Sequence, residues 1–110
     1  LELYMPLICG GEIIIASQQE VMNAPGLLQI IEEKQVTMMQ ATPSLWRLVV
    51  QALGTKTLAI RALCGGEALN DVLAVELMQK VQCLWNVYGP TETTIWSTLN
   101  LCQANNPSLI

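Results

Sequence analysis

Apolar segments and short polar turns alternate along the whole chain, and the apolar segments switch between helical and strand periodicity. A helix is predicted over residues 1–8 and ends at the glycine pair 10–11. The short β-branched stretch over residues 12–17 predicts a buried strand. Asn23 and Pro25 predict the start of the next helix, because Asn caps helices and Pro is favoured in a first turn.

The remainder of the chain continues this alternation. The predicted strands lie at residues 36–41, 59–64, 83–87 and 93–99, and the predicted helices run over residues 45–53 and from Asn70 or Asp71 to about Lys80. Strands that alternate with helices of this length predict right-handed crossovers and an α/β fold, with a mostly parallel sheet and flanking helices. Ligands bind at the carboxyl ends of the strands in such sheets. Three loops have that position, at residues 41–44, 65–68 and 88–94.

The composition limits the possible partners. The 110 residues carry a net charge of −4 with only five Lys and Arg, so a basic patch for nucleic acid is not expected. No apolar run reaches the roughly 18–20 residues of a membrane span. A signal peptide begins with a basic region that is followed by an apolar one. The start of this chain does not have that pattern, so a signal peptide is not expected. The 52% hydrophobic content fits either a buried or oligomeric domain or a piece of a larger domain.

The cysteines indicate a reducing environment. They are Cys9, Cys64, Cys83 and Cys102, none of them in a C-x-x-C arrangement, and the chain has no His, so a zinc site is not expected. Three of them lie in apolar runs, which is typical of small buried residues in a cytoplasmic protein.

The loop over residues 86–94 concentrates the chemistry of the chain. After a strand it combines Tyr88, a Gly89-Pro90 turn, Thr hydroxyls and the carboxylate of Glu92. An aromatic face can stack on a base, hydroxyls can bond phosphates, and a carboxylate is a ligand for Mg²⁺. From these residues alone, a surface turn in which Tyr88 belongs to the core and Glu92 is solvated explains the pattern slightly better.

Smaller features leave their alternatives open. The turn Gly65-Gly66-Glu67-Ala68 admits a ligand close to the backbone, or it is a tight strand-to-helix turn with Glu67 near a helix N-terminus. Gln40 ends a strand and either points into a pocket or is exposed. Trp46 and Trp85 are predicted in the core, whereas Trp96 belongs to the core or to a pocket wall.

Together these stretches resemble the adenylation domains of nonribosomal peptide synthetases, which belong to the superfamily of AMP-forming acyl-CoA synthetases and luciferases. The segment NVYGPTETTIWST resembles the motif built around Y-G-P-T-E, and ALCGGEAL is similar to the segment about twenty residues before it. ATPSLWRLVV and LELYMPLICGGEIIIAS resemble two further segments, in the same order and spacing. The resemblance spans nearly the whole chain and implies that residues 1–110 are an internal fragment of the large N-terminal part of such a domain.

The resemblance implies an amino-acid-activating ligase. An amino acid and ATP give aminoacyl-AMP, and the acyl group then passes to the phosphopantetheine thiol of a carrier domain. Peptidyl carrier and condensation domains of the same synthetase are the implied partners. The catalytic positions are Thr91 at the phosphates and Glu92 as the ligand of Mg²⁺. The implied nucleotide contacts are Tyr88 stacked on adenine, Asn86 at its amino edge, and the backbone of Gly66, Glu67 and Ala68.

The resemblance also implies a pocket for the amino-acid side chain. The matching positions are Leu1, Gln40, Leu63, Gly65, Val87, Ile95 and Trp96. None of them is charged, which disfavours an acidic or basic substrate. Trp96 takes up pocket volume while Gly65 leaves some open, so a small substrate such as glycine or alanine is expected.

The expected phosphate loop, the ribose-binding Asp and the catalytic Lys of the family are absent from this sequence, so the fragment alone is expected to be inactive. Two alternatives remain. One is an acyl- or aryl-acid-activating ligase of the same fold, and the other is a non-catalytic α/β interaction module whose loops are only turns.

Overall fold

The computed structural model describes residues 3–89, 96–105 and 107, and it has an α/β architecture. Its sheet has the order β1-β2-β3-β4, formed by β1 (Met38–Ala41), β2 (Arg61–Gly65), β3 (Cys83–Tyr88) and β4 (Thr98–Leu101). The first three strands are parallel and β4 is antiparallel to β3. The predicted mostly parallel sheet with flanking helices is therefore confirmed.

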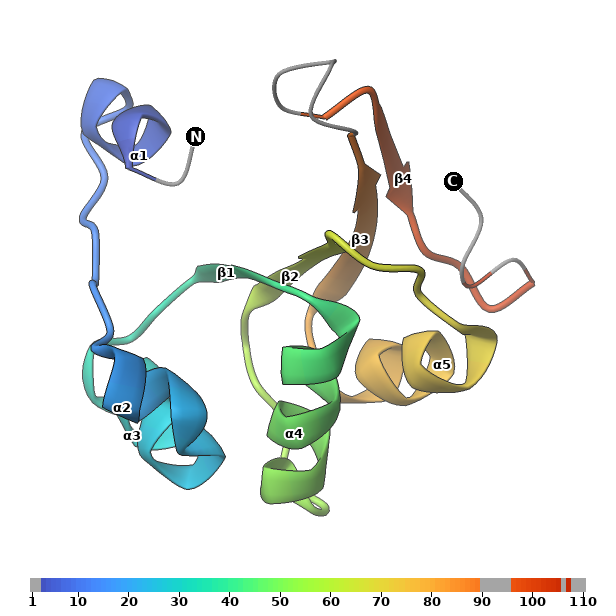
Figure 1. Ribbon diagram of the computed structural model, residues 1–110, viewed down its shortest axis with the longest axis horizontal. Helices are drawn as coiled ribbons and strands as arrows, with labels where there is room; N and C mark the ends of the chain where they lie inside the picture. The colour runs from blue at the N-terminus through green and yellow to red at the C-terminus, as the bar shows by residue number, and fades with distance from the viewer. Residues whose placement is uncertain (1–2, 90–95, 106, 108–110) are drawn as a thin grey trace.

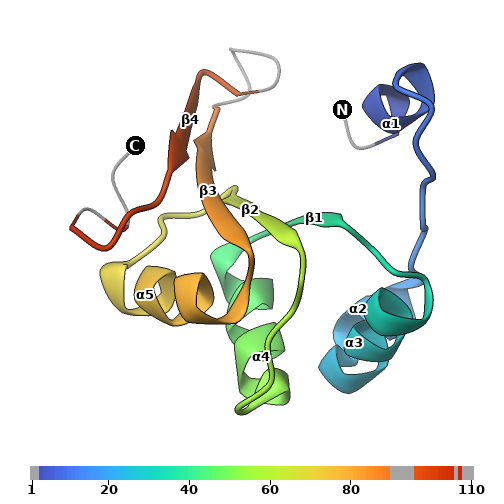
Figure 2. The same cartoon turned by 180° about the vertical axis from the view of Figure 1, so that it is seen from behind.

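Two helices connect the parallel strands, and each begins at a side-chain cap. Thr42 accepts a hydrogen bond from the backbone N–H of Leu45 and starts α4 (Pro43–Leu53). Asn70 accepts one from the N–H of Leu73 at 2.8 Å and starts α5 (Asp71–Lys80). Figure 1 shows both helices on one side of the sheet, and Figure 2 shows the same arrangement from behind. The core lies between them and the sheet.

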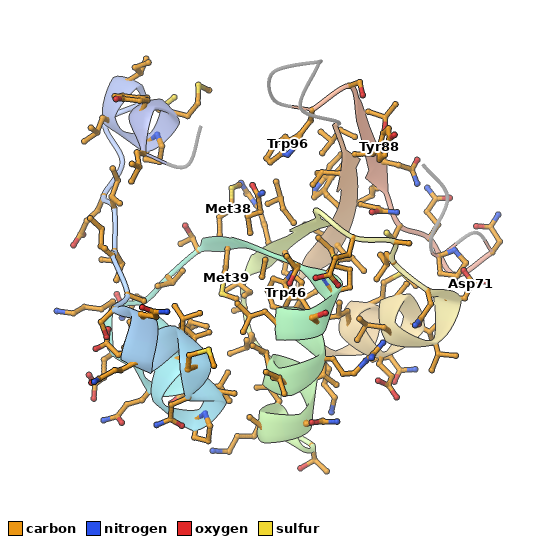
Figure 3. The ribbon with its side chains drawn as sticks, in the orientation of Figure 1. Met38, Met39, Trp46, Asp71, Tyr88 and Trp96 are labelled. Carbon is orange, nitrogen blue, oxygen red and sulfur yellow. The ribbon has the colours of Figure 1, made fainter. Side chains whose placement is uncertain are left out.

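The sheet therefore has a helix-covered face and an opposite face, called the uncovered face because none of the described helices other than α4 and α5 contacts the sheet. Along each strand the side chains alternate between the two faces. The helix-covered face contributes buried side chains to the core, among them Ala41, Ala62, Cys64 and Leu84. Figure 3 shows this alternation at β1, where Met39 lies on the same side as Trp46 of α4 and Met38 lies on the other.

The N-terminal part forms three helices, α1 (Tyr4–Ile8), α2 (Gln18–Met22) and α3 (Ala24–Glu33). The α3 helix packs against α4, and α2 packs against α3. The α1 helix ends near Gly10, whose φ of 74° is left-handed, as the predicted glycine stop requires. Figure 1 shows α1 apart from the other helices, at the end of an extended segment.

The predicted strand over residues 12–17 is wrong. This segment is extended, but it belongs to none of the ladders formed by the described residues, and Ile15 is 80% exposed. β-branched residues favour an extended backbone, yet a strand also needs a partner for its N–H and C=O groups. The chain instead continues into α2, where Ser17 and Glu20 form a reciprocal capping box.

The last strand is shifted from its predicted position. Strand pairing begins at Thr98, opposite Tyr88, and the predicted residues 93–95 lie outside the described residues. Ser97 closes the connection, because its backbone N–H donates to the Tyr88 carbonyl at 2.8 Å. A short connection of this kind returns the chain antiparallel, since a parallel neighbour needs a long crossover.

None of the helices among the described residues is long and apolar enough to cross a membrane.

Candidate functional site: one sheet edge and the uncovered face

Parallel register brings the ends of the first three strands to one edge of the sheet. Ala41 of β1 is level with Cys64 of β2, which is level with Asn86 of β3. The loops that follow these strands therefore leave from the same edge, as the sequence predicted. Of the third loop, Tyr88 and Gly89 are described, whereas the two predicted catalytic residues, Thr91 and Glu92, lie outside the described residues.

The first two loops touch each other. The hydroxyl of Ser44 donates a hydrogen bond of 2.6 Å to Oε2 of Glu67, across 23 residues of sequence. Gly66 has a φ of 88°, and a Cβ built on it would lie 3.5 Å from Cγ2 of Thr42. The predicted nucleotide-contacting turn at residues 66–68 is exposed and lies beside the first turn of α4. Its backbone groups are accessible to a ligand.

Gly65 lies too close to its neighbour on β3 to carry a side chain. A Cβ at this position would lie 2.4 Å from Cγ2 of Val87 and 2.7 Å from the Val87 carbonyl oxygen. These separations are shorter than any Cβ tolerates, so the sheet accepts only glycine here without moving. The glycine also leaves the sheet without a side chain at this point of the uncovered face.

Four of the predicted pocket residues share the uncovered face of the sheet. Gln40 is level with Leu63 in one row, and Gly65 is level with Val87 in the next. Leu63 and Val87 are buried but do not belong to the helix-side core. Figure 3 shows Trp96 on the same side of the sheet as Met38, away from Trp46. Two other predicted pocket positions, Leu1 and Ile95, lie outside the described residues.

Gln40 carries a polar atom on this face that has no partner in the described part of the chain. Its Oε1 is buried and accepts no hydrogen bond from the described residues. A buried acceptor without a donor is costly, so this position suits a site that another group completes.

The uncovered face holds further residues that are not among the predicted pocket positions. Trp85 of β3 is paired with Leu63 of β2, so it lies on the same face, and it is half-buried. The prediction that Trp85 lies in the core is therefore wrong. Met38, Leu99 and Leu101 are 53%, 53% and 40% exposed on this face. Arg61 shares it one row further from the loops and is exposed. Strand alternation, read together with the register, is the signal that finds them.

Tyr88 and Asn86 lie on β3 two residues apart, and so on the other face from Val87. Tyr88 is 51% exposed, and in Figure 3 it lies on the other side of β3 from Trp96. Asn86 is 1% exposed, in the row of Ala41 and Cys64. The structure thus presents the Tyr88 ring at the loop edge, so the alternative that Tyr88 belongs to the core is wrong, and it keeps the Asn86 side chain inside.

The cysteines have different surroundings. Cys64 and Cys102 are buried, Cys83 is intermediate and Cys9 is exposed, so burial is confirmed for two of them. Burial raises the pKa of the Cys64 thiol from 9.0 to about 12, and the nearby Cys102 and Glu67 add to this shift. Burial also raises the pKa of Cys102, opposed by a hydrogen bond with the Asn86 backbone.

The raised pKa of Cys64 predicts a loss of stability in alkali. Between pH 9.0 and about 12 the unfolded chain releases the Cys64 proton while the folded chain retains it. Unfolding is therefore favoured by up to about 1.4 kcal/mol for each pH unit in this window. Urea denaturation of the parent domain from pH 8 to pH 11 measures the slope. Cys64→Ala should reduce the slope of the unfolding free energy against pH, and the exposed Cys9→Ala should leave it unchanged. Equal slopes in the wild type and both variants would refute the raised pKa of Cys64.

A shallow groove lies away from this site, between α4 and α5. Arg47, Gln51, Asn70 and Glu76 are among the residues that line it. Among the described residues, none of the predicted site residues lines it.

Comparison with known proteins agrees with the geometry. Residues 1–109 match the family model described as AMP-binding enzyme. A dimodular nonribosomal peptide synthase from Bacillus subtilis (strain 168) is 46% identical over 97 residues, which are 88% of this chain and 4% of that protein. Tyrocidine synthase 3 from Brevibacillus parabrevis is 38% identical over 104 residues, 92% of this chain and 2% of that protein.

A solved structure is similar over the entire chain. It is holo-AB3403, a four-domain nonribosomal peptide synthetase bound to AMP and glycine, with a TM-score of 0.90 and 38% identity over 100% of this chain and 8% of its own. The chain thus spans only a few per cent of the length of these relatives. The family match, the relatives and the shared fold agree, and the chain belongs to the AMP-binding enzyme family, in its branch of nonribosomal peptide synthetase adenylation domains.

Proposed function

We propose that the protein containing this chain activates an amino acid with ATP and loads it onto a carrier. A carboxylate oxygen of the amino acid attacks the α-phosphorus of ATP, the bond to the β-phosphate oxygen breaks, and pyrophosphate leaves. The phosphopantetheine thiol of a carrier domain then attacks the acyl carbon and releases AMP. Such chemistry depends mainly on positioning and on neutralising charge at the phosphorus.

The observation that carries this proposal is that the loop edge adjoins the sheet face on which four of the predicted pocket residues lie. The first two loops are joined at the edge, and Gln40, Leu63, Gly65 and Val87 lie side by side on the uncovered face just below it. A nucleotide bound at the loop edge and an amino acid bound against the uncovered face would bring the α-phosphate and the carboxylate together. A non-catalytic module has no need for this juxtaposition or for a buried Gln40 oxygen that finds no donor among the described residues.

The roles at the edge follow from the resemblance and from the described geometry. The exposed ring of Tyr88 would stack on adenine, and the backbone of residues 66–68 would line the base. Asn86 would form a hydrogen bond with the amino edge of the base. Because its side chain is buried, the base would have to approach it from the loop side. Thr91 would contact the phosphates, and Glu92 would hold Mg²⁺. Carrier and condensation domains would be the partners.

The substrate proposed is a small neutral amino acid such as glycine or alanine. Leu63 and Val87 are buried and apolar on the pocket face, and Val87 closes tightly over Gly65. Trp96 lies on the same side of the sheet and takes up volume (Figure 3). A charged side chain placed there would lose its hydration without gaining a partner. The similarity to a protein solved with AMP and glycine supports the same choice.

Amino-acid-dependent exchange of pyrophosphate into ATP tests the proposal. The parent domain should exchange with glycine or alanine, and charged or large amino acids should be at least about tenfold weaker, the effect of roughly 1.4 kcal/mol. The isolated 110-residue chain serves as a control and should show no exchange. Activity with only aryl or acyl acids would move the assignment to the related ligases, and no ATP binding at all would leave a non-catalytic module.

A further inference from the structure

The exposed turn over residues 66–68 is held at both of its ends. Gly65 before it is paired with Val87 in the sheet, and Leu69 after it is 7% exposed in the core. Asn70 follows at once as the cap of α5. The three residues between these anchors are exposed, so their conformation depends on what they touch at the surface.

The middle of this turn is tied to α4 by one pair of side chains. Glu67 accepts the 2.6 Å hydrogen bond from the hydroxyl of Ser44, the second residue of α4. At the start of α4, Pro43 has no backbone N–H that would need a partner, and the N–H of Leu45 donates to the Thr42 hydroxyl. A carboxylate at the first turn of a helix is also favoured by the positive end of the helix dipole. The pair therefore has both a hydrogen bond and a favourable electrostatic position.

We propose that Ser44 and Glu67 are positioning residues for the nucleotide. Their hydrogen bond holds the backbone of Gly66, Glu67 and Ala68 in the orientation that receives the base, without either side chain touching the reacting atoms. This inference rests on the proposed function, because it assigns a purpose to the turn that would line the adenine. It gives the Glu67 side chain a role that is separate from that of its backbone.

A positioning role predicts a selective effect on ATP. In the parent domain, Ser44→Ala and Glu67→Ala should each raise the KM for ATP by about two- to tenfold, the range for loss of one hydrogen bond. The KM for the amino acid and the kcat should each change by less than about twofold, because neither side chain touches the reacting atoms. Pyrophosphate exchange at varied ATP and varied amino acid measures the separate constants.

Conservative variants and a double variant sharpen the test. Ser44→Thr keeps the hydroxyl and Glu67→Gln keeps an acceptor oxygen, so both should restore most of the ATP affinity. The double variant Ser44→Ala with Glu67→Ala should be no worse than either single one, because both remove the same bond. Gln29→Ala is the matched control, since it removes an exposed hydrogen bond of 2.8 Å to Glu33 on α3.

The outcomes separate this inference from the proposed function. An unchanged KM for ATP in both alanine variants, or an equal rise in the KM for ATP and for the amino acid, would overturn the inference while exchange by the wild-type domain still supports the function. Absence of ATP binding by the wild-type domain would overturn both. Thermal unfolding of each variant shows whether it is globally destabilised. For a destabilised variant, the affinity of the folded fraction for AMP is measured by calorimetry and replaces the KM for ATP in the comparison.

Discussion

Replacement of Trp46 by alanine is expected to lower the free energy of unfolding of the parent domain by about 3–5 kcal/mol. Trp46 is fully buried beneath the sheet, and its Nε1–H donates a buried hydrogen bond of 3.0 Å to the carbonyl of Leu63. The alanine variant loses the packed indole, leaves a cavity and removes the donor. Urea denaturation followed by circular dichroism measures the change.

Two further variants separate the contributions. Trp46→Phe keeps most of the apolar volume but leaves the Leu63 carbonyl without its donor, at a cost of about 1–3 kcal/mol. Leu48→Ala is the control on the same helix, because Leu48 is 48% exposed, and its effect should stay within about 0.5 kcal/mol. Similar losses at Trp46 and Leu48 would contradict the described position of α4 against the sheet.

The second large effect is expected for Gly65→Ala. The added Cβ would lie 2.4 Å from Cγ2 and 2.7 Å from the carbonyl oxygen of Val87, so strand β3 or β2 must move. Overpacking of this kind costs at least about 1–3 kcal/mol. The same movement displaces the pocket face and the turn after β2, so amino-acid-dependent pyrophosphate exchange should fall together with stability.

A second glycine provides the comparison. Gly54 has a φ of 59° and open space around a built Cβ, so Gly54→Ala should cost only the backbone strain of about 1–2 kcal/mol, with activity retained. Val87→Ala combined with Gly65→Ala should restore only part of the loss, because the Val87 carbonyl remains. Full activity in Gly65→Ala would show that the two strands are not as close as described.

Local signals predicted most of the helices. Asn70 is a predicted cap, and α5 begins directly after it. The start of α4 is two residues earlier than the predicted residue 45, because Thr42 in the predicted loop caps this helix. The predicted start at Asn23 is also confirmed, although the Asn23 side chain makes no capping hydrogen bond. The short α2 helix was missed even though Ser17 and Glu20 have the spacing of a capping box. That signal was present in the sequence and was outweighed by the β-branched run before it.

Pairing was harder to predict than conformation. The β-branched residues 12–17 are extended, but a sequence pattern does not state whether a partner strand is available. Trp85 was assigned to the core because of its size, whereas the register places it on the uncovered face beside Leu63. Which face a strand residue occupies depends on pairing across the sheet, and a shift of one residue reverses it.

The site was predictable in outline only. Alternating strands and helices placed three loops at one edge, and the register confirms that edge. The hydrogen bond between Ser44 and Glu67 and the contact between Gly65 and Val87 join residues far apart in sequence, and no local pattern contains them. The roles of Thr91 and Glu92 stay predictions, since both residues lie outside the described part of the chain.

The most direct test of the central claim is a crystal structure of the parent domain with a non-hydrolysable glycyl-adenylate analogue. The adenine should lie against the backbone of residues 66–68, and the glycyl group should lie over the face formed by Gln40, Leu63, Gly65 and Val87. An analogue bound on the helix-covered side, or in the groove between α4 and α5, would contradict the account.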